Sequence, residues 1–317
     1  MLKKIFISAV LILAVLSFVV SLLKGNNNAE KTVTVPDRVA VINISGTIIS
    51  GADSKDNIFS QTNGVTSGSI MKQIREAAAD DSVKALVLRI DSGGGSATAA
   101  EEVGRELKRF KEKTKKPIVA TIGNTGASAA YWIAVCASDK VYANATTLTG
   151  SIGVYMPYMN TEELFKKIGI TSNKIKSGPY KDIMSSDRPM TPEEQAILQN
   201  IVNEIYEQFV TTVAVGRKME ESKVKSLADG RVYTGMQAKN LGLVDEIGDY
   251  YDALAAAGEL GKIKPGADGL PPVKAKEKKQ PWEFLLSAHI AELIKTELVN
   301  QLTGSLQQSG APAGGMT

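Results

Sequence analysis

The sequence predicts an α/β fold of repeated β-α-β units. Apolar runs at 84–90 and 117–122 have the length and the Val, Ile and Leu content of buried strands. A helical pattern at 98–111 lies between them, with short connections on both sides. Strands that alternate with helices in this way form parallel sheets. The composition agrees, because 43% of the 317 residues are apolar and 22% are charged, as in globular proteins.

Further elements are expected on both sides of this unit. A strand at 38–44 and a helix at 69–80 precede it. The elements expected after it are a helix at 127–137, strands at 140–143 and 148–155, a helix at 161–168, a strand at 171–176, a long helix at 191–217, and short helices at 221–227, 235–240 and 250–260. The long helix is predicted to begin at Thr191, because Thr191 and Glu194 form a capping-box pattern around Pro192.

An uncharged, strongly apolar segment runs from Ile5 to Leu23. As a helix of about 1.5 Å per residue it spans roughly 28 Å, close to the hydrocarbon core of a bilayer. A cleaved signal peptide is the alternative, but its apolar region is usually about 7–15 residues long and ends in small residues. This segment is longer and ends in Leu-Leu-Lys, which favours an uncleaved transmembrane anchor. Lys3 and Lys4 precede it and only Lys24 follows, so the N-terminus is predicted to be cytoplasmic and the body extracytoplasmic.

The whole chain is predicted to divide into a folded body and polar connections. Residues 1–24 form the cytoplasmic N-terminus and anchor, 25–36 a tether, 37–262 one α/β domain, 263–280 a linker, 281–302 an amphipathic helix and 303–317 a disordered tail. The amphipathic helix could pack on a neighbouring subunit, lie on the membrane or occupy a substrate groove.

Charge and the counts of Cys and His exclude several classes of function. Lys3, Lys4 and Lys24 account for the whole formal net charge of +3, so the rest of the chain is neutral and nucleic-acid binding is not expected. A single cysteine, Cys136, excludes an intrachain disulfide and a multi-cysteine zinc site. A single histidine, His289, excludes a His-rich metal site, and it makes lysine the obvious base for any nucleophilic catalysis.

Three segments are candidates for chemistry. In Asp91-Ser92-Gly93-Gly94-Gly95, between a strand and a helix, consecutive glycines can aim backbone N–H groups at a phosphate or at the oxyanion of acyl transfer. The segment lacks the Gly-Lys-Ser/Thr of a Walker loop. The alternative is a tight turn without chemistry.

The second and third segments supply a candidate nucleophile and a candidate base. Gly126 to Ala130 places Ser128 at the first turn of an uncharged helix, where the positive end of the helix dipole favours a developing negative charge. The alternative is that Ser128 only caps the helix. The loop Ser177 to Met184 contains Lys181. A lysine is usually a solvated surface charge, but a buried neutral lysine can serve as the base for a serine nucleophile.

Four segments resemble the signal peptide peptidase A family, the half-length Ser-Lys peptidases of family S49 that are related in fold to Clp protease and crotonase. They are RIDSGGGS, TGASAAYWIAVCASDKVYANATTLTGSIGV, SGPYKDIMSSDRPMTPEE and DGRVYTGMQAKNLGLVDEIG. They occur in the family's order and spacing, between about Val39 and Leu260. The resemblance implies a ClpP/crotonase-like fold.

The resemblance also implies the site residues. Ser128 matches the nucleophile and Lys181 the general base. Ser151 matches a serine that hydrogen-bonds and orients the lysine. Gly94 and Gly95 match the glycine turn whose N–H lies in the oxyanion hole. Neither a metal nor a cofactor is implied.

The function that the resemblance implies is that of a membrane-anchored serine endopeptidase, which degrades remnant signal peptides after their release from secreted preproteins. It would be a single-pass protein of the bacterial cell membrane with an extracytoplasmic catalytic domain. Related enzymes form homo-oligomeric rings or domes, and some complete the dyad across neighbouring subunits.

Two departures from the family pattern leave alternatives open. Ala129-Ala130 replaces the usual Gly-Gly after the nucleophile, and Gly93 replaces the usual Pro before the glycine pair. The added methyls are expected to narrow the pocket and Gly93 to loosen the oxyanion loop, but no reacting group is lost. The alternatives are a non-catalytic membrane scaffold with the same fold, and a crotonase-like acyl-CoA enzyme that would need neither the Ser-Lys pair nor an anchor.

Overall fold

The computed structural model describes residues 36–52 and 64–274. The predicted anchor, Ile5–Leu23, and the predicted amphipathic helix, 281–302, lie outside these ranges. Within the two ranges, no helix combines the length and the apolar character that a membrane span needs.

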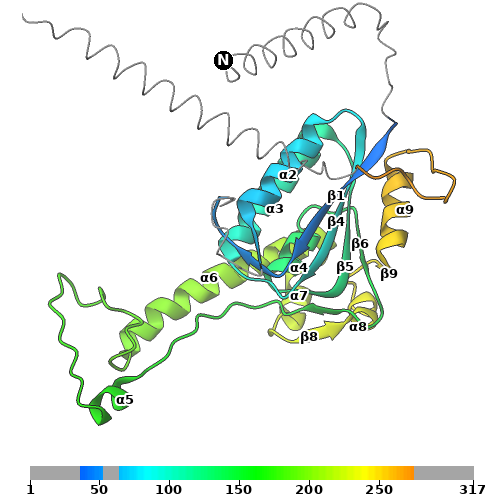
Figure 1. Cartoon of the computed structure of the whole chain (residues 1–317). Helices are drawn as coiled ribbons and strands as arrows, with labels where there is room; N and C mark the ends of the chain where they lie inside the picture. The colour runs from blue at the N-terminus through cyan, green and yellow to red at the C-terminus, as the bar shows by residue number, and fades with distance from the viewer. Residues whose placement is uncertain (1–35, 53–63, 275–317) are drawn as a thin grey trace, which may run out of the picture. The chain divides into compact units, whose positions relative to one another are not determined.

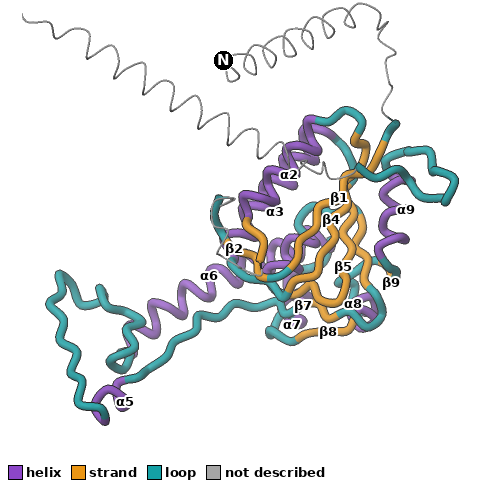
Figure 2. The backbone as a smooth tube through the Cα atoms, viewed as in Figure 1, coloured by secondary structure: helices purple, strands orange, loops and turns teal. Residues whose placement is uncertain are grey.

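A mostly parallel sheet lies at the centre of the described chain (Figure 1, Figure 2). Its order is β1 (Arg38–Ser45), β4 (Val83–Ser92), β5 (Ile118–Ala127), β6 (Lys140–Ala143) and β9 (Glu246–Ile247), with every neighbouring pair parallel. β7 (Leu148–Gly150) pairs in parallel with the end of β5, and β8 (Val232–Thr234) pairs antiparallel with β7. A separate two-stranded sheet joins β2 (Thr47–Ile49) to β3 (Gly64–Thr66). The predicted α/β architecture is confirmed.

Helices cover both faces of this sheet. The larger core packs under α2 (Ser67–Ala79), α3 (Ala97–Thr114) and α4 (Ala129–Val135), and the smaller core packs under α9 (Tyr250–Leu260) on the opposite face. The remaining helices are α5 (Glu162–Lys167), α6 (Pro192–Arg217), α7 (Glu221–Leu227) and α8 (Gly235–Asn240). Along β4, Leu86 and Leu88 join the larger core while Ala85 and Val87 join the smaller one. Because both faces of β4 are covered, its central residues 85–88 are all apolar.

The long helix α6 begins as predicted, with a complete capping box between Thr191 and Glu194. Its C-terminal half packs against α4, where Phe209 stacks on Trp132 with ring centroids 4.9 Å apart. Its N-terminal half is mostly exposed and extends away from the sheet together with the segment that precedes it (Figure 1). Residues 156–201, which include α5, are called the arm below.

Predicted elements next to the site differ from the structure in their bounds. The strand predicted at 117–122 continues to Ala127 as β5, because Thr125 and Gly126 pair with Leu148 and Thr149 of β7. The expected helix 127–137 begins later and ends earlier, as α4.

The predicted strand at 171–176 is wrong. This segment is irregular and exposed, and no strand lies beside it within the described chain. Lys174 and Lys176 form ion pairs with Asp187 and Asp182, so side-chain contacts hold this part of the arm in place of a β ladder.

The chain stays attached to the sheet beyond α9. Ile263 is buried in the smaller core, and the Val39 N–H donates to the carbonyl oxygen of Pro272 at 2.8 Å. Val273 forms a parallel bridge with Val39 at the open edge of β1.

The crossing of α6 over α4 depends on Gly216. A Cβ at this position would lie 2.1 Å from the carbonyl oxygen of Val135, which is too close for any side chain. We expect Gly216→Ala to lower the free energy of unfolding by about 1–3 kcal/mol through overpacking. Chemical denaturation followed by tryptophan fluorescence measures this. Gly104→Ala in α3 is the control, because its Cβ would meet Cys136 Sγ at 3.4 Å, an ordinary contact; equal stability of the two variants would contradict the prediction.

Candidate active site

Ser128 lies at a sharp turn between β5 and α4. Its φ of 54° and ψ of −128° are unusual for a residue with a side chain, and such strain concentrates at functional sites. The Ser128 amide donates to the carbonyl oxygen of Gly150 at 2.9 Å, which fixes the turn against the end of β7. Although Ser128 is the N-cap residue of α4, its side chain forms no capping hydrogen bond. The interpretation of Ser128 as only a helix cap is therefore wrong, and its hydroxyl is available for other contacts.

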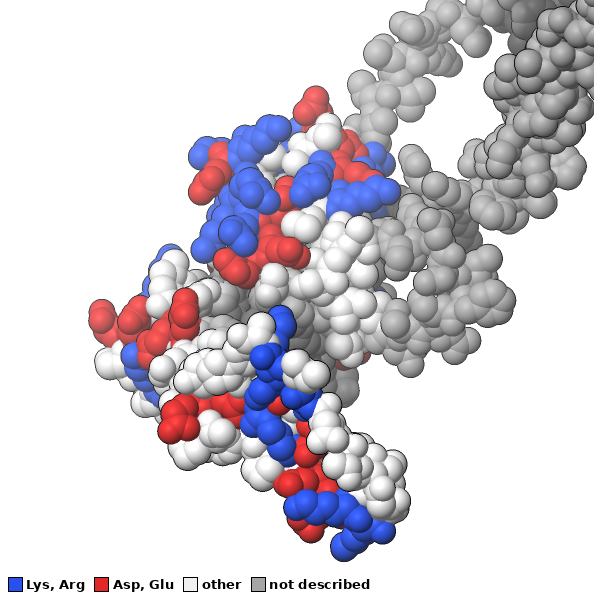
Figure 3. Space-filling view, turned by 90° about the vertical axis from the view of Figure 1, so that its left-hand side faces the viewer, with Lys and Arg blue, Asp and Glu red and all other residues white. Residues whose placement is uncertain are grey.

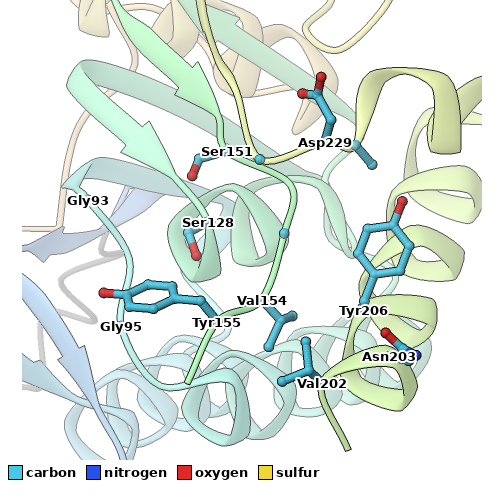
Figure 4. A pocket seen from close by; sticks show the side chains of 13 residues that line it. Gly93, Gly95, Ser128, Ser151, Val154, Tyr155, Val202, Asn203, Tyr206 and Asp229 are labelled. Atoms are coloured by element: carbon cyan, nitrogen blue, oxygen red, sulfur yellow. The ribbon is translucent and has the colours of Figure 1, made fainter. Parts of the chain in front are cut away.

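A cleft of about 560 Å³ opens at Ser128 (Figure 4). The residues that line it include Gly93, Gly95, Ser128, Ser151, Val154, Tyr155, Val202, Tyr206 and Asp229. Figure 4 shows Ser128 and Ser151 together on the side of the cleft opposite the α6 residues. The structure thus brings together three of the predicted site residues, Ser128, Ser151 and Gly95, from three separate parts of the chain.

The glycine turn after β4 touches Ser128 directly. A Cβ on Gly94, whose φ is 106°, would lie 2.8 Å from the Ser128 Cβ. The Gly94 N–H donates to the buried hydroxyl of Ser92 at 3.1 Å, and this hydroxyl donates to the Gly46 carbonyl oxygen at 2.5 Å. Within the described chain, the Gly95 N–H donates to no acceptor. The lack of a side chain at Gly94 therefore lets the glycine turn approach Ser128 closely. The Gly95 N–H remains available as a hydrogen-bond donor.

Ser151 is held at the cleft by its backbone. It follows Gly150, and both residues have positive φ, 49° and 81° respectively, which ends β7 well before residue 155, where the strand was predicted to end. The Ser151 amide donates to the Arg231 carbonyl oxygen at 2.9 Å, and the Gly230 amide donates to the Ile152 carbonyl oxygen at 3.1 Å. No hydrogen bond engages the Ser151 hydroxyl within the described residues.

Lys181 lies elsewhere. It is exposed on the arm, it is absent from the residues that line the cleft, and its ammonium group forms no ion pair or hydrogen bond with the described residues. A single chain therefore places the candidate base apart from the candidate nucleophile.

The two departures from the family pattern have little effect on the cleft. Ala129 and Ala130 are 4% and 0% exposed and their side chains belong to the larger core, so the expected narrowing of the pocket does not occur. Gly93 has no atom within 4 Å of a Cβ built on it. A side chain is compatible with the space at this position.

Sequence reasoning missed the far wall of the cleft. Val202 and Tyr206 are one turn apart on α6, which presents them on the same face. Asp229 forms an ion pair with Arg231, Nε to Oδ1 at 2.8 Å, and this contact holds the pKa of the carboxyl below its usual range. The only available signal was that Asp229 opens one of the four segments that carry the family resemblance.

Metal binding has no evident site in the described chain. Among residues 36–52 and 64–274, no group of three or more His, Cys, Asp and Glu side chains is arranged to hold a metal ion.

Comparison with known proteins identifies the family. Residues 110–264 match peptidase family S49, and this range includes Ser128, Ser151 and Lys181. A protein of Synechocystis sp. that is named as a protease is 41% identical over 228 residues, which cover 72% of this chain and 76% of that protein. The chain belongs to peptidase family S49.

Other relatives in this family differ from the chain in length. Protease 4 of Salmonella typhi is 38% identical over 71% of this chain, but the match covers only 35% of Protease 4. An Enterococcus faecium protein named as a signal peptide peptidase SppA is 37% identical over 68% of this chain and 62% of its own length. The family predicted from the four sequence segments is confirmed.

The contact between Gly94 and Ser128 predicts unequal effects of adding one methyl group to the glycine turn. Gly94→Ala should lower kcat/KM for a fluorogenic peptide by about 10²-fold or more, because the methyl displaces the Ser128 side chain. Gly93→Ala should leave kcat/KM within about threefold, because open space surrounds its Cβ. Circular dichroism would verify folding of both variants. Equal losses of activity would show that the close contact does not matter.

The single thiol is predicted to be inert in the folded protein. Burial at the C-terminal end of α4 raises the pKa of Cys136 to about 12, and the residue is 6% exposed. A thiolate is the reactive form, so iodoacetamide at pH 8 should leave the folded chain unmodified and label it once in denaturant. Mass spectrometry measures both states, and rapid labelling of the folded chain would contradict the burial.

Proposed function

We propose that this chain is a serine endopeptidase in which Ser128 is the nucleophile and Lys181 of a neighbouring copy is the general base. The proposal rests on the backbone conformation and the surroundings of Ser128. It occupies a strained turn in a cleft, its hydroxyl caps no helix, and the same cleft is lined by Gly95, whose N–H donates to no acceptor among the described residues. Family membership supplies the peptidase chemistry.

The proposed reaction uses a neutral lysine. As Ser128 Oγ bonds to the scissile carbonyl carbon, its proton passes to Lys181 Nζ, and the Gly95 N–H donates to the oxyanion that forms. Collapse of the tetrahedral intermediate breaks the C–N bond, and the leaving amine takes the proton from Lys181. Water, deprotonated by the same lysine, then attacks the acyl-enzyme, and the bond from the carbonyl carbon to Ser128 Oγ breaks as the lysine returns the proton to Oγ. The Ser151 hydroxyl would accept a hydrogen bond from Nζ and orient it.

The surface of the arm supports a base supplied by a second copy. Lys181 is exposed there, and the same arm exposes many large apolar side chains: Tyr158, Met159, Leu164, Ile168, Ile170, Ile175, Tyr180, Met184, Ile197 and Ile201. Soluble monomers rarely expose so much apolar surface in one region. Packing of the arm on a neighbour would cover this surface and bring Lys181 to the neighbour's cleft. A closed homo-oligomeric ring or dome of this kind would keep folded proteins away from the cleft.

The proposed substrates are remnant signal peptides. Val154, Tyr155, Val202 and Tyr206 supply apolar lining to the cleft, which suits the apolar segment of such a peptide once it is extended. One relative carries the name of a signal peptide peptidase. The predicted anchor at Ile5–Leu23 would place a ClpP/crotonase-like catalytic domain outside the cytoplasm, at the bacterial cell membrane where signal peptides are released.

Two observations weigh against the alternative functions. A non-catalytic scaffold loses its best support, because Ala129 and Ala130 point into the core and leave the cleft open. An acyl-CoA enzyme is disfavoured because the chain belongs to a peptidase family.

The dyad is tested with the full-length chain in mild detergent and a fluorogenic peptide that has small apolar residues before the cut. Ser128→Ala and Lys181→Ala should each lower kcat by about 10³-fold or more. When equal amounts are mixed and reassembled, about a quarter of wild-type activity should return, because one site in four then combines an intact serine with a neighbour's intact lysine. Lys167→Ala, another exposed arm lysine, is the control and should retain activity.

Each result of this test has a definite meaning. Activity in Ser128→Ala would refute the nucleophile. Two inactive single variants whose mixture stays inactive would show that the dyad forms within one chain. A wild-type assembly that cleaves no peptide would favour the scaffold.

A further inference from the structure

A cluster of ion pairs holds the loop that carries Lys181. Its members are Lys174, Lys176, Asp182, Asp187, Arg188 and Glu194. Figure 3 shows positive and negative side chains interleaved along this projecting part of the chain. The cluster lies outside the cleft, and the reaction described above assigns it no role.

Arg188 is the centre of the cluster. Its guanidinium contacts Asp182 twice, with Nε 2.9 Å from Oδ2 and Nη2 2.8 Å from Oδ1. It also contacts Glu194 twice, with Nη1 2.8 Å from Oε2 and Nη2 2.5 Å from Oε1. Glu194 is 2% exposed and closes the capping box of α6. Arg188 therefore links the residue that follows Lys181 to the first turn of the long helix.

Other contacts close the loop around Lys181. Lys176 Nζ lies 2.7 Å from Asp182 Oδ1 and donates to the Pro179 carbonyl oxygen at 3.2 Å. The Lys181 amide donates to the Gly178 carbonyl oxygen at 3.3 Å. The backbone of Lys181 is thus held, while its amine forms no ion pair or hydrogen bond with the described residues. The neighbouring carboxylate of Asp182 pairs with Lys176 and Arg188 instead.

These contacts are unlike an isolated surface ion pair, which contributes little. Both carboxylates accept two hydrogen bonds from one rigid guanidinium, and Asp182 is only 11% exposed. The Arg188 contact lowers the pKa of Glu194 to about 2, and with Lys176 it holds the pKa of Asp182 well below its usual range. The cluster therefore remains charged over the whole range in which a peptidase works.

We propose that Arg188 is a positioning residue for the general base: it fixes Asp182, and with it Lys181, to the start of α6, so that the arm presents a prearranged amine. The inference rests on the proposed role of Lys181. If Lys181 acts in a neighbouring subunit, the cleft of its own chain does not help to position its amine. Its geometry has to be set within the arm, since a displacement of about 1 Å can cost about 10²-fold in rate.

The first test measures Arg188→Gln in the full-length assembly. We expect kcat to fall by about 10–100-fold with KM changed less than about threefold, because alignment of the base is lost while the cleft is intact. Arg188→Lys should regain a large part of the loss, since one ammonium can still pair with a carboxylate. Lys166→Gln is the matched control, because it removes ion pairs to Glu162 and Glu163 elsewhere on the arm. Light scattering verifies the assembly size of every variant.

The second test asks which subunit needs Arg188. In mixtures of Ser128→Ala and Lys181→Ala chains, Arg188→Gln should lower kcat when it is added to the Ser128→Ala chain, which donates Lys181. Added to the Lys181→Ala chain, it should leave kcat within about twofold. Equal losses in the two arrangements would reveal a general structural role and overturn the proposal. If the two mixtures are inactive without Arg188→Gln, the single-chain comparison of kcat and KM decides.

A measurement that needs no catalysis separates the two proposals. If Arg188 holds the loop, trypsin should cut after Lys181 about tenfold faster in Arg188→Gln than in wild type, as local opening becomes easier. Faster cutting with unchanged kcat would overturn the positioning role alone. An intact assembly that cleaves no peptide would refute the proposed peptidase and the positioning role together.

Discussion

The candidate site depends on the close approach of two backbone turns at the carboxyl edge of the sheet. β4 and β5 are parallel neighbours, and the pairing of Ser92 with Gly126 sets how far each strand extends before it turns. This register places Gly94 against Ser128 with no room for a side chain between them. A slip of one residue would move the glycine away from the serine and turn the apolar side chains of β4 to the wrong core. The same pairing therefore serves the core and the site.

Packing of α4 connects this turn to the far wall of the cleft. Its first turn follows Ser128, and its middle carries Trp132, which stacks on Phe209 of α6. Val202 and Tyr206 lie earlier on α6 and line the cleft. A buried aromatic contact thus sets where the cleft wall stands relative to Ser128. Core substitutions at this crossing would be expected to alter peptide binding as well as stability.

The sequence pattern predicted those features of the site that depend on residues close together in the chain. Ser128 and the glycine turn were selected from the sequence because each lies where a strand is followed by a helix, whereas Ser151 was named only by the family resemblance. The wall residue Tyr206 was not found, because its position depends on how α6 crosses α4. The strand predicted at 171–176 failed because its apolar residues have no partner strand within the described chain. The local sequence pattern can predict a strand, but it cannot predict whether a partner strand will lie beside it.

The body and the arm are stabilised by different forces, and this difference bears on how activity could be controlled. The body encloses a large apolar core, whereas the loop of the arm that carries Lys181 is held by charged contacts and leaves its apolar side chains uncovered. If Lys181 acts in a neighbouring cleft, as proposed, an isolated chain would be folded but inactive. Assembly would then bury the apolar surface of the arm and complete the catalytic pair in the same step. A protease built in this way would become active only inside the closed assembly that restricts its substrates.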